Sequence, residues 1–418
     1  MHVAALPWAL CFAAVSGVSL LTPTSPAAWR LGPVAGPIDP DVSARIDVLR
    51  ILLIGLIVLC HGGRFVGADV PFAGPAATFV LTLVNRGLDC VAVPLFFAIS
   101  GFLLLRKLEL SPAAYAGLMR RKIVSIGLPF LFFNAVWIGW IFAFGSIERF
   151  GSRSYLLQTG IVNLLLGIGV SPLNYPLWFL RDLLLVFACT PVFLLLYKRA
   201  PTAGLLGLGL LWFLGSPGSE YSLGGFCFAF YAGGYLARRR LNLRDTAGWD
   251  RYVLPAFAAG CVVVGLTPWL GLDLPTLAAV KKAHQMVGVA AFWCVSRLGW
   301  IKGSALLHRL AALSFFLFLT HEPTVSVLQT RLLALWQPTG TIAQLAAYFL
   351  PGLTAIVALS GLGWLLARFM PGLFAVLTGA PLRLRRPAAA VVLTPVADFG
   401  GVAAEPGRLN GKARAGGV

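Results

Sequence analysis

The chain has 418 residues, of which 58% are hydrophobic and only 11% are charged, and its mean hydropathy is +0.85. This composition excludes a water-soluble globular protein, and repeated apolar runs of about 20 residues predict an all-α integral membrane protein. The net charge of +18 would suit a nucleic-acid-binding protein. The basic residues cluster between the apolar runs, however, so we predict the lipid bilayer as a partner and no nucleic acid.

Residues 1–44 are an N-terminal extension that precedes the predicted core. Residues 3–22 are apolar but lack a basic start and include Pro7, and residues 23–40 are rich in proline, alanine and glycine. A weak signal sequence, an additional helix and a start assigned too early all fit this pattern, and the last two are favoured.

The predicted membrane domain covers residues 45–370 and contains about ten transmembrane helices. A further apolar piece, 155–170, is predicted to remain within an external loop. Residues 371–418 are predicted to be a disordered tail, because they are rich in alanine, proline and glycine after Arg386. The predicted spans are 46–65, 86–105, 123–144, 177–197, 203–216, 221–237, 252–271, 275–296, 311–333 and 342–367.

The basic residues predict the orientation of these helices. By the positive-inside rule, the N-terminal end of the core and the C-terminal tail are cytoplasmic. We expect Lys281, Lys282 and His284 to form the solvated start of a span on the opposite side, and the membrane to be the inner (cytoplasmic) one. On the cytoplasmic side lie 25 of the 33 lysine and arginine residues, within 1–50, 106–122, 198–199, 238–251, 297–309 and 368–414.

Arg50 and His61 lie in one apolar segment and are eleven residues apart. Eleven steps of about 100° bring both side chains to nearly the same helix face, with a rise of roughly 16 Å between them. Because ionisable groups at such depth in a membrane are costly, they are candidates for function. The alternatives are a snorkelling anchor for Arg50 and a packed core histidine for His61.

The seven cysteines are scattered without metal-ligand spacing, so we predict small buried side chains and no bound metal. Cys60 is adjacent to His61, and its position on the helix directs it about 100° away from that side chain. It is therefore not favoured as a nucleophile.

Four motifs follow one another along the membrane domain. They are Arg50-x10-His61, then Phe96-Phe97-x-x-Ser100-Gly101, then Leu177-Trp178-Phe179-Leu180-Arg181, and finally Ser314 to Pro323 with His321-Glu322 near its end. In this order, on about ten spans, residues 45–370 resemble membrane acyltransferase family 3, which includes polysaccharide O-acetyltransferases and succinyltransferases.

This resemblance implies an enzyme, an acyltransferase, that takes an acyl group from cytoplasmic acyl-CoA and delivers it to a glycan or glycolipid acceptor across the membrane. It implies that Arg50 helps to bind the donor and that His61 is the catalytic histidine. Many relatives carry two arginines three residues apart in the basic loop before the third span. Here Lys122 and Ser125 occupy the aligned positions.

The chemistry of the residues agrees with these roles. Arg120, Arg121 and Lys122, together with Arg106 and Lys107, make a basic cluster that suits the phosphates of acyl-CoA. A neutral imidazole can act as general base near pH 7, or it can itself carry the acyl group.

Five further residues are predicted to lie on the acceptor side or to support the site: Ser100, Trp178, Arg181, His321 and Glu322. Each also has a structural alternative. Ser100 suits a close helix contact beside a glycine, Trp178 suits a membrane-interface residue, and the His321-Glu322 pair suits a stabilising contact in the bundle.

The predicted function is therefore O-acylation, most simply O-acetylation, of a surface or exported polysaccharide, with acyl-CoA as co-substrate and no tightly bound cofactor. The alternative is a transporter or flippase for a glycan or its lipid-linked precursor, since intramembrane charges serve transport equally well. The sequence does not specify the acyl group, the acceptor, the oligomeric state, or whether His61 acts as base or acyl carrier.

Overall fold

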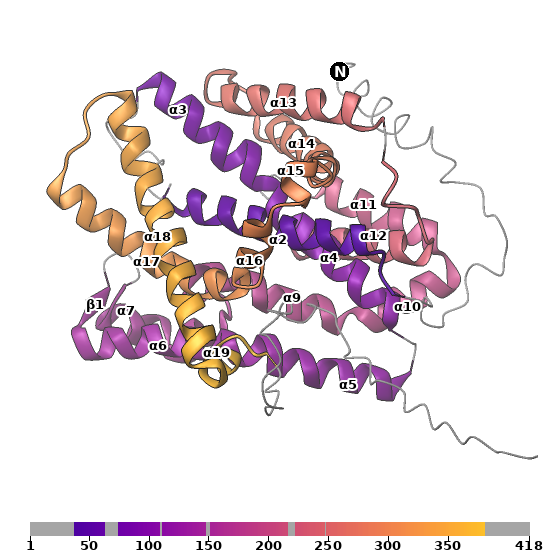
Figure 1. Cartoon of the computed structure of the whole chain (residues 1–418), viewed down its shortest axis with the longest axis horizontal. Coiled ribbons are helices and arrows are strands. Elements are labelled where there is room, and N and C mark those ends of the chain that lie inside the picture. Colours follow the sequence, from indigo (N-terminus) through magenta and orange to yellow (C-terminus); the bar gives the residue numbers. More distant parts are fainter. Residues whose placement is uncertain are drawn as a thin grey trace, which may run out of the picture.

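The computed structural model describes residues 37–62, 74–108, 111–147, 151–215, 222–246 and 248–380. These residues form a bundle of α-helices with one short two-stranded antiparallel ribbon (Figure 1). The predicted disordered tail begins with a short helix at Pro371–Leu377, and residues 381–418 lie outside the described residues, as do residues 1–36 of the N-terminal extension.

The elements follow one another in this order: α2 (Pro40–His61), α3 (Pro75–Thr82), the π-helix η3 (Leu83–Leu88), the 3-10 helix η4 (Asp89–Val91), α4 (Ala92–Lys107), α5 (Pro112–Lys122), the π-helix η5 (Ile123–Gly127), α6 (Leu128–Phe144), β1 (Ser146–Ile147), β2 (Gly151–Ser152), α7 (Arg153–Thr159), α8 (Ile161–Leu166), η6 (Tyr175–Leu177), α9 (Trp178–Ala188), α10 (Thr190–Arg199), α11 (Pro201–Leu214), α12 (Leu223–Arg238), α13 (Asp250–Leu266), η8 (Thr267–Trp269), α14 (Leu274–Val295), α15 (Gly299–Lys302), α16 (Ala305–Ala311), α17 (Ser314–Leu335), α18 (Thr341–Phe369) and α19 (Pro371–Leu377).

Each of the ten predicted spans coincides with helical residues, but fewer helices qualify as spans by length and apolar composition. In the described part of the chain, four continuous runs qualify, and two bent helix pairs raise the number to six. These helices make a multi-pass membrane protein, whereas the count of ten and the orientation remain predictions. The runs are Pro75–Lys107, Pro112–Phe144, Asp250–Trp269 and Thr341–Phe369, and the pairs are Tyr175–Ala188 with Thr190–Arg199 (47°) and Ala305–Ala311 with Ser314–Leu335 (72°).

The apolar piece 155–170 contains two helices that are each too short to cross a bilayer, which takes about 20 residues. α7 has 7 residues and α8 has 6. They are separated at Gly160, whose φ of +89° is a conformation that glycine adopts without a steric penalty. This geometry agrees with the prediction that the piece does not cross.

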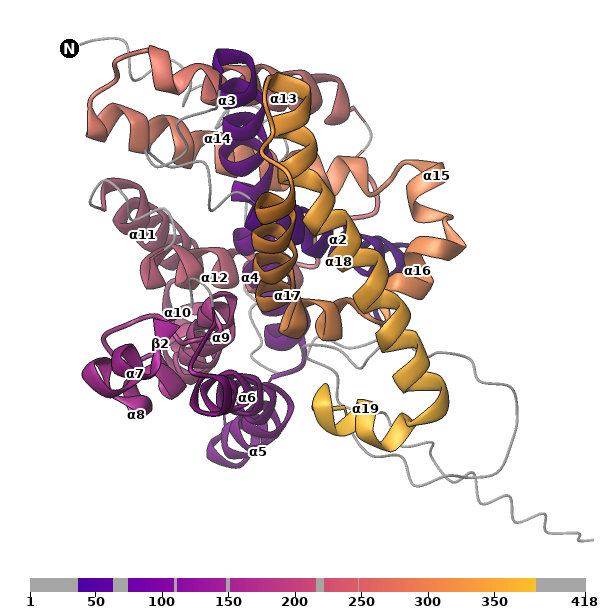
Figure 2. The ribbon, with the colours of Figure 1, turned by 90° about the vertical axis from the view of Figure 1, so that its left-hand side faces the viewer.

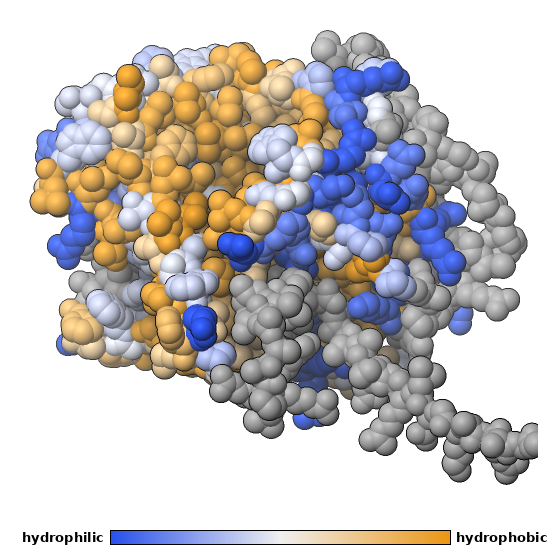
Figure 3. All heavy atoms as spheres, in the orientation of Figure 1, coloured by the Kyte–Doolittle hydropathy of each residue, from blue (hydrophilic) through white to orange (hydrophobic). Residues whose placement is uncertain are grey.

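The outer surface of the bundle carries many exposed apolar side chains. Val357 and Leu365 on α18, Val262 on α13 and Leu211 on α11 are all exposed. Figure 3 shows a broad hydrophobic face with a hydrophilic margin towards its right side. A contiguous apolar surface of this extent suits contact with lipid.

α2 lies in the middle of the bundle, and the neighbouring helices α17 and α18 both pack against it (Figure 2). Behind it, α4 and α12 approach so closely that only glycine fits at the contact. A Cβ atom on Gly101 would lie 1.9 Å from the carbonyl oxygen of Phe230, and one on Gly233 would lie 1.8 Å from that of Ala98. The Ser100-Gly101 motif is thus part of a close helix contact.

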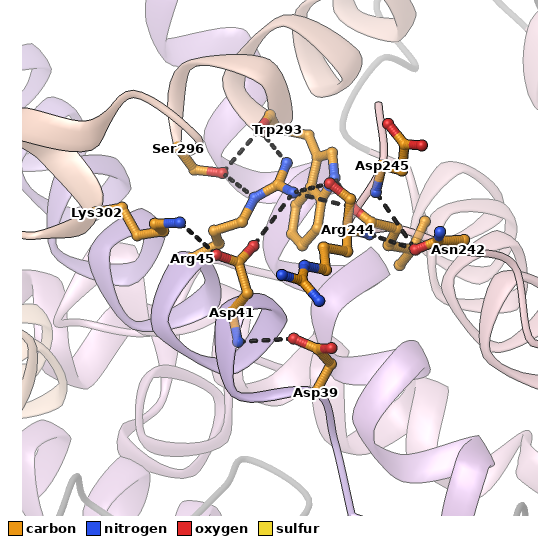
Figure 4. Close-up of polar contacts among 10 residues, drawn as sticks. Asp39, Asp41, Arg45, Asn242, Arg244, Asp245, Trp293, Ser296 and Lys302 are labelled. Atoms are coloured by element: carbon orange, nitrogen blue, oxygen red, sulfur yellow. Dashed lines mark hydrogen bonds and ion pairs between the residues drawn. The ribbon is translucent and has the colours of Figure 1, made fainter. Parts of the chain in front are cut away.

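The first turns of α2 are fixed by Arg45, which is fully buried (Figure 4). Its guanidinium donates hydrogen bonds to the Trp293 carbonyl (2.7 Å), the Leu243 carbonyl (2.9 Å) and Ser296 Oγ (3.1 Å). It also lies 4.1 Å from the centre of the Trp293 ring. Asp41 completes this Arg45 cluster by pairing with both Arg45 and Lys302.

The prediction that Lys281, Lys282 and His284 form a solvated start of a span is wrong for the last two. Lys282 is buried, and its Nζ donates to the carbonyls of Trp212 (2.9 Å) and Gly215 (3.0 Å) at the end of α11. A cation is favourable there because the last carbonyls of a helix have no partner within it. His284, also buried, contacts the Gly87 carbonyl at 2.8 Å.

Candidate active site

A cavity of about 540 Å³ lies beside the second half of α2. One wall is formed by α2 and by the irregular middle of the Pro75–Lys107 run. The remaining walls come from the segment before η6, from η6 and α9, and from the first residues of α17. The lining residues are Ile54, Ile57, Cys60, His61, Asn85, Asp89, Val93, Phe96, Ser171, Tyr175, Pro176, Trp178, Phe179, Arg181, Asp182, Ser314, Phe315 and Phe318.

The cavity extends along the length of the helices, over about two turns of α2. It is lined by Ile54 and by His61, which are seven residues apart on α2 and therefore separated by about 10 Å along the helix axis. On α17 it is lined by Ser314, whereas His321, seven residues further on, packs against His61. The two helices thus run past the cavity in the same direction.

His61 is the last residue of α2, and its ring is held in one orientation. Its Nδ1 lies 2.6 Å from the carbonyl oxygen of Ile57, so Nδ1 carries the proton and donates it to this carbonyl. The lone pair is then on Nε2, the nitrogen that a general base needs. Because His61 lines the cavity, the structure places the predicted catalytic side chain at a site of substrate size.

His321 packs against His61, and neither His321 nor Glu322 lines the cavity. The rings of His61 and His321 meet edge to face with their centroids 4.9 Å apart. His321 is fully buried, and its Nδ1 lies 2.7 Å from the Phe318 carbonyl. Glu322, also fully buried, accepts a hydrogen bond from Ser326 Oγ (3.2 Å). Of their two predicted roles, this position fits support of the site.

Trp178 and Arg181 both line the cavity, so they lie in the same site as His61. The Trp178 ring stacks on Phe226, with centroids 5.5 Å apart. Arg181 Nε donates to Asp182 Oδ1 (2.7 Å), and its Nη1 donates to the Gly167 carbonyl (2.5 Å). Both side chains are thus fixed by their neighbours, Trp178 by a residue of α12 and Arg181 by Asp182 and the Gly167 carbonyl.

Ser100 is buried at the contact between α4 and α12 and does not line the cavity. The placement of Gly101 against Phe230 explains why a small residue is needed there. The structure therefore does not bring Ser100 to His61.

The predicted donor-binding cations lie outside the cavity lining. Arg50 is buried, and its Nη1 forms an ion pair with Asp47 at 3.1 Å. Arg120 and Arg121 are exposed in the last turn of α5. Lys122 is buried, with its ammonium 5.0 Å from the centre of the Phe187 ring. Arg50 precedes the cavity-lining Ile54 by one helical turn, so it is the cation on α2 nearest to the cavity along the chain.

Asn85, Asp89 and Cys60 are among the cavity residues that the sequence missed or misjudged. The carboxylate of Asp89 within an apolar run was a readable signal of function, but the face that it occupies was not. Cys60, which was predicted to point about 100° away from His61, also lines the cavity, and its Sγ contacts the Val84 carbonyl at 3.7 Å. In the described residues no three His, Cys, Asp or Glu side chains gather as metal ligands.

Comparison with known proteins gives two findings. A family model described as "Acyltransferase domain" matches residues 43–361, a range that contains every residue that lines the cavity. The chain is also similar to the succinoglycan biosynthesis protein ExoH of Rhizobium meliloti (strain 1021), with 30% identity over 365 residues, which cover 83% of this chain and 95% of that protein. No solved structure matches the chain.

Proposed function

The chain belongs to the acyltransferase 3 family, and we propose that it transfers an acyl group, most simply acetyl, from acyl-CoA to a hydroxyl of a surface or exported glycan. The similarity to a protein of succinoglycan biosynthesis supports a polysaccharide as the acceptor. We place the enzyme in the inner membrane, with the N-terminal end of α2 in the cytoplasm.

The observation that carries this proposal is the orientation of His61 in the cavity. With Nδ1 donating to Ile57, Nε2 is the nitrogen that accepts the proton of the acceptor hydroxyl. The hydroxyl oxygen attacks the thioester carbonyl, the C–O bond forms and the C–S bond breaks. The proton then passes from the imidazolium to the leaving thiolate, so that CoA leaves as the thiol. A positioned base of this kind contributes about 10²–10⁴-fold in rate.

The shape of the cavity supports donor and acceptor entry from opposite ends. The wall towards Ile54, Ser314 and Phe315 is mostly apolar and suits the acyl group and the pantetheine arm. We assign donor binding to Arg50, and the capture of the CoA phosphates to the exposed Arg120 and Arg121 together with Lys122. No tightly bound cofactor takes part.

The opposite end of the cavity suits a sugar. Trp178 and Tyr175 supply aromatic surfaces, and Arg181 and Asp182 supply polar groups. We assign these residues to the acceptor, whereas His321 and Glu322 hold His61 in place. Ser100 takes no part in this assignment because it lies outside the cavity.

The proposal is tested by mass spectrometry of surface glycans from a deletion strain that carries either the wild-type gene or His61→Ala, with protein levels matched. We expect an O-acyl mass increment with the wild type and its loss, by at least about 100-fold, with the variant. The increment identifies the acyl group. Full acylation with His61→Ala contradicts the proposal, and the disappearance of an entire glycan from the surface of the deletion strain favours a transporter.

A further inference from the structure

The Pro75–Lys107 run is a single long apolar stretch, but its middle is not a regular α-helix. After α3 the backbone widens into the π-helix η3, then tightens into the 3-10 helix η4, and only then continues as α4. Such π-segments within helices are frequent at functional sites. This irregular middle is the part of the run that brings Asn85 and Asp89 to the cavity.

Asn85 is held by the protein through both ends of its amide. Its Nδ2 donates to the Leu81 carbonyl at 2.8 Å, and its Oδ1 accepts from the Tyr348 hydroxyl at 2.7 Å. The same hydroxyl also contacts the Cys60 carbonyl at 3.3 Å. Asn85 is thus a fixed structural member of the cavity wall.

Asp89 differs from Asn85, because its Oδ1 is buried and accepts no hydrogen bond from any side chain or backbone group of the described residues. An unsatisfied carboxylate oxygen inside an apolar span is costly. Two cationic partners can be considered, and neither bonds to it. Arg181 is engaged by Asp182 and by the Gly167 carbonyl, and His61 uses its Nδ1 proton on Ile57.

We propose that Asp89 binds the acceptor, accepting a hydrogen bond from a hydroxyl next to the one that reacts. This assignment rests on the proposed function, because it takes Nε2 of His61 as the base. Vicinal hydroxyls are the feature that distinguishes a sugar residue from a simple alcohol, and a carboxylate accepts from them strongly. With one hydroxyl on Asp89, its neighbour is oriented towards His61, so Asp89 selects polyhydroxylated acceptors.

The test measures steady-state transfer by the full-length protein in lipid nanodiscs. The donor is the acyl-CoA whose acyl group the mass increment identifies, and the acceptor is the exported polysaccharide of the deletion strain. Asp89→Asn keeps the shape and removes the charge. We expect it to lower kcat/KM for the acceptor roughly 10-fold or more, because a neutral hydrogen bond is about half as strong as a charged one. KM for the donor is expected to remain as in the wild type. The thermal midpoint should stay the same or rise, because the variant removes a costly buried charge.

Asp250→Asn is the matched control, because Asp250 forms a half-exposed ion pair with Arg297 and does not line the cavity. It should leave both KM values unchanged. A change in donor KM with Asp89→Asn, or unchanged kinetics for the acceptor, overturns the assignment of Asp89. If His61→Ala transfers normally in the same assay, the proposed function itself fails, whereas an inactive His61→Ala beside an unaffected Asp89→Asn removes only this inference.

Discussion

The two ends of α2 both place polar side chains inside an apolar bundle, but they do so in different ways. In the Arg45 cluster, the guanidinium is fully used by three carbonyls, a hydroxyl and the Trp293 ring. At the other end, only one ring nitrogen of His61 is used, in the hydrogen bond to the Ile57 carbonyl. Asp89 Oδ1, on the neighbouring η4, has no hydrogen-bond partner among the described residues.

This contrast distinguishes polar groups whose hydrogen bonds are made within the protein from polar groups that still have a position for a hydrogen bond to a ligand. A buried cation whose hydrogen bonds are all made by the protein stabilises one arrangement of helices and has no capacity left for a ligand. A cavity-lining nitrogen or oxygen with a spare lone pair has that capacity. The contrast predicts that substitutions at the first end act on stability and those at the second end act on turnover.

The largest effect on stability is expected for Arg45→Met. It removes a buried cation and its hydrogen bonds to the Leu243 and Trp293 carbonyls, which then keep only the Trp293 indole and the Ser296 hydroxyl as donors. Because a hydrogen bond to a charged group contributes about 1.5–3 kcal/mol, we expect a cost of about 3–5 kcal/mol. The thermal midpoint in detergent is the measurement. Lys302→Met is the control, because its pair with Asp41 is partly exposed and contributes at most about 1 kcal/mol. If the two variants lower the thermal midpoint equally, the buried contacts of Arg45 do not stabilise the fold more than a partly exposed ion pair does.

A second prediction concerns His321, which packs its ring against His61. His321→Ala opens a space behind the His61 ring, the proposed general base. We expect a loss of roughly 10–100-fold in kcat, since a small displacement of a reacting group is costly. His321→Phe fills that space and should retain most of the activity. If the phenylalanine variant is as inactive as His61→Ala, His321 takes part in proton transfer and is not merely a support.

A third prediction uses the contact between α4 and α12. Gly101→Ala places a methyl group 1.9 Å from the Phe230 carbonyl, so the helices must separate, at a cost of about 1–3 kcal/mol. Gly55→Ala is the matched control on α2, because no atom beyond the neighbouring backbone of its own helix lies within 4 Å of the added methyl group. There the higher helix propensity of alanine should raise stability by about 0.5–1 kcal/mol. Thermal midpoints that move in the same direction would contradict this packing.

Much of the site was predictable because it follows from local helix geometry. The spacing of Arg50 and His61 depends only on the helical repeat, and the structure confirms that α2 carries both residues. The contacts that the sequence did not reveal join segments far apart in the chain. Lys282 was misplaced because its partners are the last carbonyls of α11, about 70 residues away.

Asp89 was missed for a related reason. An aspartate in an apolar run gives no sign of which face it occupies when the helix changes from a π to a 3-10 conformation. The number of membrane spans could not be predicted from composition alone. α2 and α14 are both 22 residues long, but they carry charged residues and are not among the helices that qualify as spans by apolar composition.

The account is tested most directly by measuring, in the same nanodisc preparations, the thermal midpoint and the acyl transfer per folded molecule for His61→Ala and Arg45→Met. We predict that His61→Ala keeps the wild-type midpoint and loses transfer, whereas Arg45→Met loses several degrees or more and keeps transfer in the molecules that remain folded. The reverse pattern, with an active His61→Ala or a stable but inactive Arg45→Met, would contradict the division of α2 into a structural end and a reactive end.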